Sequence, residues 1–332
     1  MVEKKHCILT DMLFRTGVKN VERGGFMEFC SQHGRGRIVQ VGNQYLYKDL
    51  IQQLKQLQCA YPDLDVLEIG RSVMGKPIHC LRLGTGPRAI HMNASVHANE
   101  WITSPLLLRF VEEIAASSAV ATERWSTEAC LWLKEFTLWA VPMVNPDGVN
   151  LSQEGVTASH ANADELISWN KGSMDFSRWK ANIHGVDLND QFPAYWEEEQ
   201  QRRGIHMPAS QDYGGSAPLT EPEAKALAEL TRWENFELAL SLHTQGKEIY
   251  WNYRDLEPYE SQKLAHRFSY ASGYRAVKLT GSDAGYKDWF IKEFRRPGFT
   301  IEAGEGVNPL PPADFERIYA EVSELFAEAM RS

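Results

Sequence analysis

Apolar and polar residues alternate along this chain with two different periods, and the switching between them predicts an α/β fold. Leu46, Leu50, Leu54 and Leu57 recur at helical spacing ahead of Pro62, which predicts a helix that stops before the proline. Short apolar runs bounded by turn residues predict strands. These strands are expected at residues 65–69, 77–83, 89–96, 136–144, 236–242, 248–252 and 299–301. Further helices are expected at residues 104–114, 220–233, 257–272 and 312–330.

Strands that alternate with helices favour a mostly parallel or mixed sheet covered on both faces. Neither an internal repeat nor a linker divides the chain, so residues 45–332 are expected to form one catalytic domain. Residues 1–44 are read as an extension packed on it, with a short strand at residues 38–41. Residues 145–148, Asn-Pro-Asp-Gly, predict a turn, and a capping box at residues 220–223 predicts a helix start. The long loop-rich stretch at residues 150–219 is expected to be functional.

Composition excludes several classes of protein. With 43% hydrophobic and 24% charged residues among 332, the chain reads as soluble and globular. It has no apolar run of about eighteen residues, as a membrane span requires. A net charge of −9 argues against nucleic acid as a partner. The start lacks the apolar stretch of a signal peptide, and the five cysteines form no Cys-x-x-Cys pair. We therefore expect reduced thiols and a cytoplasmic protein; the oligomeric state stays open.

The residues with the clearest chemistry lie where predicted strands end. His97 follows one strand with Glu100 close behind it, His243 ends a second strand, and Glu302 ends a third. Ligands of open α/β sheets bind beyond the carboxyl ends of the strands, so these side chains should converge. Two imidazoles and a carboxylate are a ligand set of catalytic zinc. A desolvated Glu302 would then be the general base. Taken singly, each histidine could instead be an ordinary hydrogen-bonded group, and Glu302 an exposed strand-end charge.

Five motifs in order resemble the zinc carboxypeptidase family (peptidase family M14) over about residues 45–330. They are His97-Ala98-Asn99-Glu100-Trp101, Asn145-Pro146-Asp147-Gly148, Gly185-Val186-Asp187-Leu188-Asn189, Ser241-Leu242-His243-Thr244 and Thr300-Ile301-Glu302. The resemblance implies Zn²⁺ held by His97, Glu100 and His243, with Glu302 as general base and acid. It also implies a three-layer α/β/α sandwich around a mixed, roughly eight-stranded sheet.

One position departs from the family pattern. Asp190 stands where the family usually carries an arginine that grips the carboxylate of the substrate's terminus. An aspartate there would attract an ammonium group instead. Residues 188–193, Leu-Asn-Asp-Gln-Phe-Pro, resemble the branch of γ-D-glutamyl-L-diamino acid (meso-diaminopimelate) peptidases. The resemblance implies that Asn189 and Asp190 position a diamino acid; the alternative is that Asp190 caps a loop.

Two further roles that the family implies are harder to assign. The cation that steadies the oxyanion could be Arg178, Lys180 or His184, all in the same region. The mobile tyrosine of the family could be Tyr286, although a packed aromatic residue is the alternative reading.

The function expected from the resemblance is that of a zinc metallopeptidase. It would hydrolyse the γ-D-glutamyl–diamino acid amide bond of peptidoglycan stem peptides, with a small murein peptide as substrate. One alternative is a metallocarboxypeptidase or amidohydrolase acting on other peptides or small amides. Another is a non-catalytic protein that binds peptidoglycan fragments.

Overall fold

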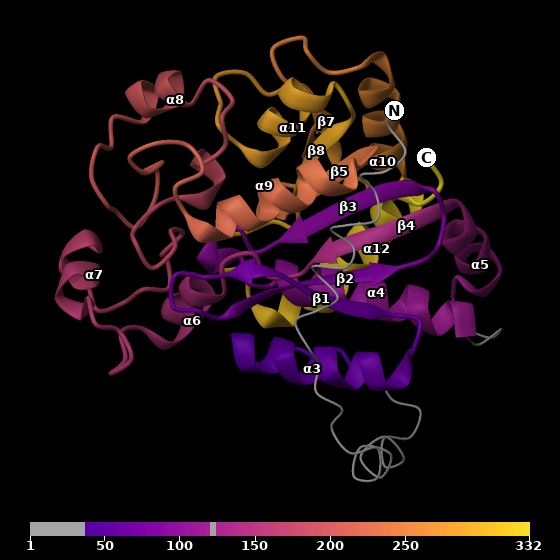
Figure 1. Cartoon of the computed structure of the whole chain (residues 1–332), viewed down its shortest axis with the longest axis horizontal. Helices are drawn as coiled ribbons and strands as arrows, with labels where there is room; N and C mark the ends of the chain where they lie inside the picture. Colours follow the sequence, from indigo (N-terminus) through magenta and orange to yellow (C-terminus); the bar gives the residue numbers. More distant parts are fainter. Residues whose placement is uncertain (1–36, 120–123) are drawn as a thin grey trace, which may run out of the picture. The chain divides into compact units, whose positions relative to one another are not determined.

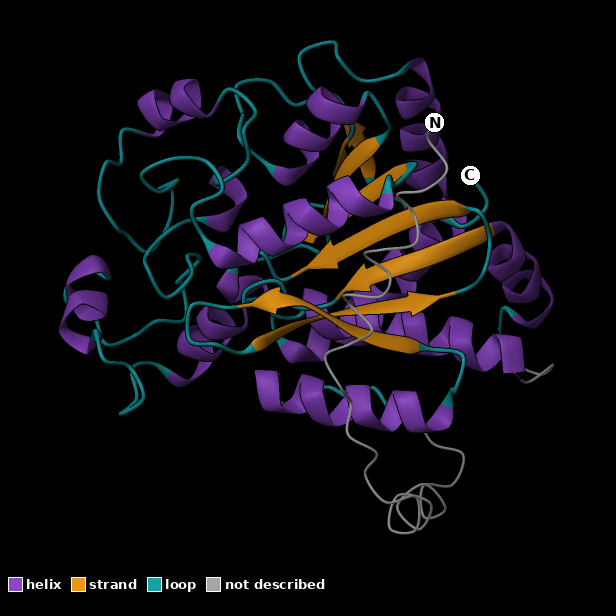
Figure 2. Ribbon diagram, viewed as in Figure 1, coloured by secondary structure: helices purple, strands orange, loops and turns teal. Residues whose placement is uncertain are grey.

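A single mixed sheet of eight strands organises the computed structural model, which describes residues 37–119 and 124–332. Its strands are β1 (Asp65–Arg71), β2 (Pro77–Leu83), β3 (Arg88–Ala94), β4 (Phe136–Val141), β5 (Leu238–His243), β6 (Glu248–Tyr250), β7 (Arg275–Val277) and β8 (Gly298–Glu302). They lie in the order β1-β2-β4-β3-β5-β8-β6-β7. The four central strands β4, β3, β5 and β8 run parallel (Figure 2), so their carboxyl ends share one edge.

Helices cover both faces of this sheet (Figure 1), which confirms the predicted α/β class. The α-helices are α3 (Tyr47–Ala60), α4 (Thr103–Ala119), α5 (Ser126–Glu135), α6 (Pro146–Glu154), α7 (Ala163–Trp169), α8 (Trp196–Arg203), α9 (Pro222–Glu234), α10 (Tyr259–Ser272), α11 (Tyr286–Phe294) and α12 (Phe315–Ala329). Three 3₁₀ turns among the described residues are η1 (Ala98–Glu100), η2 (Leu188–Asp190) and η3 (Pro312–Asp314). One core contains residues of α3, α4, α5, α10 and α12, and a second contains residues of α9 and α11.

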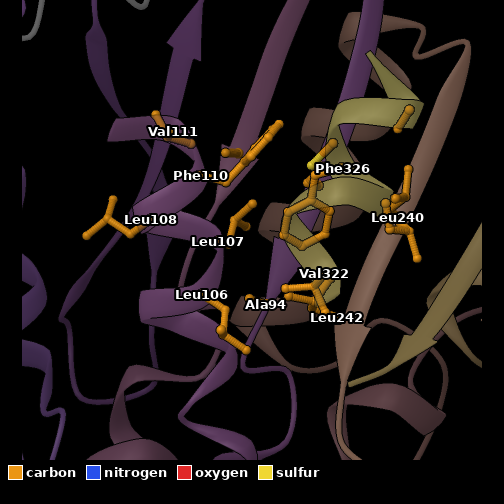
Figure 3. Close-up of a cluster of buried hydrophobic side chains, with 14 of the residues drawn as sticks. Ala94, Leu106, Leu107, Leu108, Phe110, Val111, Leu240, Leu242, Val322 and Phe326 are labelled. Carbon is orange, nitrogen blue, oxygen red and sulfur yellow. The ribbon is translucent and has the colours of Figure 1, made fainter. Parts of the chain in front are cut away.

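The alternation of side chains along each strand explains the two cores. On β5, Leu240 and Leu242 face the larger core while Ala239 faces the other. Figure 3 shows Leu240 and Leu242 beside α4 and α12, whose buried side chains include Phe110 and Phe326. Phe110 and Phe326 contact each other with ring centroids 5.1 Å apart. The central strands are thus buried on both faces, and their carboxyl ends form the edge where the candidate residues lie.

Residues 38–44 belong to the same compact unit as the rest, which runs from Ile38 to Ser332. The predicted strand at residues 38–41 is wrong. The Glu112 carboxylate accepts the amide N–H groups of Ile38 (2.6 Å) and Val39 (2.9 Å), so the backbone there has side-chain partners instead of a neighbouring strand. The rest of the predicted extension, residues 1–36, lies outside the described residues, and its packing stays a prediction.

Two local predictions fail for identifiable reasons. The predicted turn at residues 145–148 is instead the start of α6. Asn145 caps that helix, because its side-chain oxygen accepts the Gly148 N–H (3.0 Å), and Pro146 takes the first helical position, where a missing N–H costs nothing. The predicted capping box of α9 does not form, because the Thr220 hydroxyl hydrogen-bonds Gln191 and Ala217 instead.

The described free cysteines agree with the expectation of reduced thiols. They are Cys80, which is buried, and Cys130, which is partly exposed. Cys7 and Cys30 lie outside the described residues. Within the described part of the chain, no helix has both the length and the apolar character needed to cross a membrane.

Candidate metal centre and catalytic cleft

The parallel strands β3, β5 and β8 bring the candidate residues to one edge of the sheet. His97 follows β3 and leads directly into η1, which contains Glu100. His243 is the last residue of β5 and Glu302 the last of β8, and the two are direct partners across the strand pair. Three distant segments therefore meet, as the strand-end pattern predicted.

Three side chains converge closely enough to share one ion. His97 Nδ1 lies 2.9 Å from Glu100 Oε1, and His243 Nδ1 lies 3.1 Å from Glu100 Oε2. The two Nδ1 atoms are 3.2 Å apart. All three residues are buried, with 8%, 2% and 2% of the surfaces of His97, Glu100 and His243 exposed. The ligand atoms of these three residues all lie within 4.8 Å of one another.

The far sides of both rings show why this cluster suits a cation. His97 Nε2 lies 3.2 Å from Asp187 Oδ1, and His243 Nε2 lies 3.2 Å from the Ser241 hydroxyl. An Nε2–H that donates to Asp187 or to Ser241 leaves the opposite Nδ1 as an unprotonated acceptor. Two nitrogen lone pairs and a carboxylate would then face one another in a buried place, an arrangement that a divalent cation stabilises. The donor set therefore fits zinc.

The electrostatics of the cluster agree with this reading. Burial alone would lower the pKa of His97, but the neighbouring carboxylates of Glu100 and Asp187 outweigh it and raise the pKa to about 10. Burial would likewise raise the pKa of Glu100, yet His97 and His243 hold that pKa well below its usual range. The cluster thus attracts positive charge, and a bound metal would replace the proton on His97.

Glu302 stands beside this cluster as an acid without a hydrogen-bond partner among the described residues. It lines a cleft of about 450 Å³ together with His97 and Glu100. Burial raises the pKa of Glu302 to about 8, and the nearby charge of Glu100 adds to the rise. A carboxylate whose pKa lies near neutrality is suited to take and return a proton. The other lining residues are Asn99, Arg178, Lys180, Gln211, Thr244, Gln245, Tyr250, Val307 and Asn308.

Two cations project into this cleft. Lys180 Nζ lies 3.9 Å from Glu100 Oε1. Burial would lower the pKa of Lys180, but Glu100 and other acids, Glu302 among them, raise it, so the ammonium stays charged. Arg178 lines the same cleft, and its guanidinium donates to the main-chain carbonyl of Asn308. Of the three cations that the sequence left open for the oxyanion, these two lie in the cleft.

His184, the third candidate cation, does not lie in the cleft. Its Nδ1 lies 2.8 Å from Glu221 Oε2, and 52% of its side chain is exposed. The hydrogen bond to Glu221 raises the pKa of His184 more than any other influence does. His184 therefore forms an ion pair beside the start of α9, and a substrate contact from this residue is not supported.

Tyr286 is also absent from the cleft. It is 1% exposed, and its hydroxyl exchanges a hydrogen bond of 2.9 Å with Thr231. Its ring packs among Phe192, Trp289 and Phe290. The packing of Tyr286 agrees with the alternative reading of a packed aromatic residue, and the structure gives no support to the catalytic role expected of it. The tyrosine in the cleft is Tyr250, which the sequence did not single out; its hydroxyl donates to Glu248 (2.6 Å).

Asp190 and Asn189 are not among the residues that line the cleft. Asp190 is 1% exposed, and its Oδ2 lies 3.2 Å from Nε of Arg203, a residue of α8. Asn189 is partly exposed but does not line the cleft. Burial raises the pKa of Asp190, and Arg203 is its cationic neighbour within the fold. Direct recognition of a substrate ammonium by Asp190 is therefore not supported.

Asp190 is one of three neighbouring aspartates, with Asp187 and Asp212, whose oxygens could in principle hold a second ion. Arg203 supplies the positive charge there, with Nη1 at 2.8 Å from Asp212 Oδ1 and Nε at 3.2 Å from Asp190 Oδ2. The Asp212 N–H donates to Asp187 (3.1 Å), which links this pair to the metal ligand His97. These contacts hold the Asp187 carboxylate in place, and Asp187 in turn orients the ring of His97, a candidate metal ligand.

Comparison of the sequence with known proteins assigns the chain to a family. The sequence pattern of the family described as zinc carboxypeptidase (Peptidase_M14) matches residues 50–324. The chain is 49% identical over 291 residues to gamma-D-glutamyl-L-diamino acid endopeptidase 1 of Lysinibacillus sphaericus, which covers 87% of this chain and 73% of that protein. It is 41% identical to the Bacillus subtilis protein YqgT, over 84% of this chain and 75% of that protein.

Solved structures give the same result for the fold. The crystal structure of thrombin-activatable fibrinolysis inhibitor matches with a TM-score of 0.69 at 19% identity, covering 92% of this chain and 79% of that one. The carboxypeptidase A from Helicoverpa armigera matches with a TM-score of 0.63 at 17% identity, covering 92% and 78%. At these identities the likeness concerns the fold alone.

Proposed function

Because this chain belongs to the zinc carboxypeptidase family and is a zinc-dependent hydrolase, we propose that it cleaves the amide bond between γ-D-glutamate and a diamino acid in peptidoglycan stem peptides. The observation that carries the proposal is a buried His–Glu–His donor set beside Glu302, in a chain 49% identical to a γ-D-glutamyl-L-diamino acid endopeptidase.

Each residue has a distinct part in the proposed mechanism. His97, Glu100 and His243 would hold the zinc ion. When bound, zinc polarises the scissile carbonyl and lowers the pKa of water. Glu302 takes the proton of the attacking water and delivers it to the nitrogen of the leaving amine. The Lys180 ammonium, close to Glu100, donates to the oxygen that becomes negative in the tetrahedral intermediate.

The pairing of Asp190 with Arg203 supports an activity different from that of an ordinary carboxypeptidase. The family resemblance places a carboxylate-binding arginine at position 190. Here that position is an aspartate, and the arginine it pairs with lies 2.9 Å from Glu199 as well. The metallocarboxypeptidase alternative therefore has no support from this position.

Mass spectrometry of digests of defined peptides tests the proposal. The zinc-loaded protein should release diaminopimelate from L-Ala-γ-D-Glu-diaminopimelate and leave an α-linked isomer intact. Cleavage of hippuryl-type peptides in preference to the γ-linked peptide would favour the carboxypeptidase alternative. A purified chain that binds γ-linked peptides without stoichiometric zinc or turnover would favour the non-catalytic alternative.

The cytoplasmic site of action expected from the sequence remains part of the proposal, with free recycled murein peptides as substrates. Cell fractionation tests this part of the proposal. Recovery of the protein with the soluble cytoplasmic fraction supports it, whereas recovery with the secreted fraction contradicts it.

A further inference from the structure

We propose that Arg178 determines specificity by binding the free α-carboxylate of a γ-linked D-glutamyl residue, which lies a short alkyl chain away from the scissile carbonyl. This inference rests on the proposed function and names the substrate group that the cleft selects. The mechanism above gives Arg178 no role in the chemical step.

The position of Arg178 is fixed from two sides. Its main-chain carbonyl accepts a hydrogen bond from the Asn99 side chain (3.4 Å), and Asn99 lies between the ligands His97 and Glu100. Its guanidinium donates to the main-chain carbonyl of Asn308. Asn308 is itself tied to the site, because its side chain donates to the Thr244 carbonyl (2.8 Å) and lies 3.4 Å from Glu100. The guanidinium is therefore held in the cleft wall close to the metal centre.

The charge of Arg178 has no acidic partner in the part of the chain that the structure describes. No carboxylate of these residues forms an ion pair with it, and its only hydrogen-bond acceptor there is a neutral carbonyl. Asp175, on the same loop, accepts the Ser177 N–H (2.9 Å), and this hydrogen bond lowers the pKa of Asp175 more than the charge of Arg178 does. Most other arginines among the described residues form an ion pair, as Arg267 does with Glu328. An arginine left unpaired and exposed in a cleft is available to a ligand.

The carboxylates of the cleft have other partners or roles and do not require Arg178 as a counter-charge. Glu100 would be a zinc ligand, and Lys180 already lies 3.9 Å from it. Glu302, the remaining acid of the cleft, acts as the base. Arg178 is thus a surplus cation in the cleft that the candidate metal ligands line, which favours an anionic group on the substrate. A guanidinium binds a carboxylate through two parallel hydrogen bonds, a geometry that lysine cannot supply.

The proposed substrate supplies such a group in the right place. In a γ-linked glutamyl residue the side-chain carboxyl forms the scissile amide, so the α-carboxylate remains free and ionised a short alkyl chain away. When the α-carboxyl is amidated to isoglutamine, that charge is lost. Arg178 would therefore distinguish D-glutamyl from D-isoglutaminyl peptides.

A substrate pair tests the assignment. We would measure kcat/KM of the zinc-loaded full chain on L-Ala-γ-D-Glu-diaminopimelate and on its isoglutamine counterpart. The unmodified protein should prefer the acid by about 10- to 100-fold, the range of a charge-assisted hydrogen bond. Arg178→Gln should remove the preference, and Arg178→Lys should keep part of it. Arg267→Gln, remote on α10, is the control and should keep all of it. An unchanged preference in Arg178→Gln overturns the inference.

A binding measurement separates this inference from the proposed function. If the unmodified protein cuts neither peptide, the proposed function fails. Calorimetric titration of the same two peptides into zinc-loaded Glu302→Gln, with and without Arg178→Gln, then tests the inference alone. Tighter binding of the acid that depends on Arg178 supports it, whereas equal affinities or an undetectable interaction overturn it.

Discussion

His243 and Glu302 are direct partners in the register of two parallel strands, each at the last position of its strand. One is a metal-ligand candidate and the other the candidate base. Because adjacent strands lie about 4.8 Å apart, the sheet itself fixes the spacing between metal and base. The leucines behind them on β5 are buried in the larger core, so this spacing does not depend on a mobile loop.

Replacing the base should abolish turnover without removing the metal. Glu302→Gln keeps the shape of the side chain but cannot accept a proton, so kcat should fall by about 10²- to 10⁴-fold, the usual contribution of general acid–base catalysis. Zinc content measured by mass spectrometry should be unchanged. Glu305→Gln, at an exposed position just after β8, is the matched control. Full activity in Glu302→Gln would refute the mechanism.

Removing zinc should destabilise the protein as well as inactivate it. A ligand that binds only the folded state stabilises it by about 2.7 kcal/mol at a free concentration of 100 times its Kd. We therefore expect a chelator to lower Tm and added zinc to restore it. His243→Ala, which removes one ligand, should lose the zinc-dependent rise in Tm. A rise of the same size in that variant would contradict the assigned site.

Asp187 should control metal affinity without touching the metal. It lies 3.2 Å from His97 Nε2 and also accepts the backbone N–H groups of Asn189 and Asp212, at 3.1 Å each. Loss of such a partner typically weakens metal binding about 10- to 100-fold. Asp187→Asn should show this loss in a competition titration with a chelator. Asp175→Asn, an exposed acid of the same region, should bind zinc as tightly as the unmodified protein.

Glu223 should make the stability depend on pH. It is fully buried at the start of α9, and burial raises its pKa from 4.5 to about 7. Between these values the unfolded chain has released the proton that the folded chain still holds. Raising the pH therefore favours unfolding, and stability should fall by about 3 kcal/mol from pH 4.5 to 7 on account of this group.

Urea unfolding at several pH values measures the effect. Glu223→Gln cannot ionise, so the difference in unfolding free energy between it and the unmodified protein should shift in favour of the variant as the pH rises, then level off above pH 7. Glu229→Gln, on the exposed side of the same helix, should follow the unmodified protein at every pH. A constant difference between Glu223→Gln and the unmodified protein would refute the assignment.

The metal site could be anticipated from sequence because its signal is local. His243 and Glu302 each end an apolar strand, where packing gives no reason for a polar residue, and parallel strands bring such ends together. The α/β class followed from the same periodicity. The burial of Tyr286 could also have been anticipated, because Tyr286, Trp289 and Phe290 share the spacing of a buried helical face.

Other parts of the site could not be read from the chain. The pairing of Asp190 with Arg203 depends on where α8 directs a long side chain, which no periodicity encodes. Lining residues such as Thr244 and Asn308 come from irregular loops, and their contacts with each other and with Glu100 arise only in the folded chain. The candidate metal ligands and base could thus be identified from the sequence, whereas the shape of the cleft depends on contacts that form only in the folded chain.

Arg203 is balanced by Asp190, Glu199 and Asp212 inside the fold. An arginine saturated in this way cannot also anchor the end of a peptide. We therefore expect the enzyme to recognise the groups that flank the scissile bond rather than a free end of the peptide. Peptides lengthened beyond the diamino acid should accordingly be cut at the same bond.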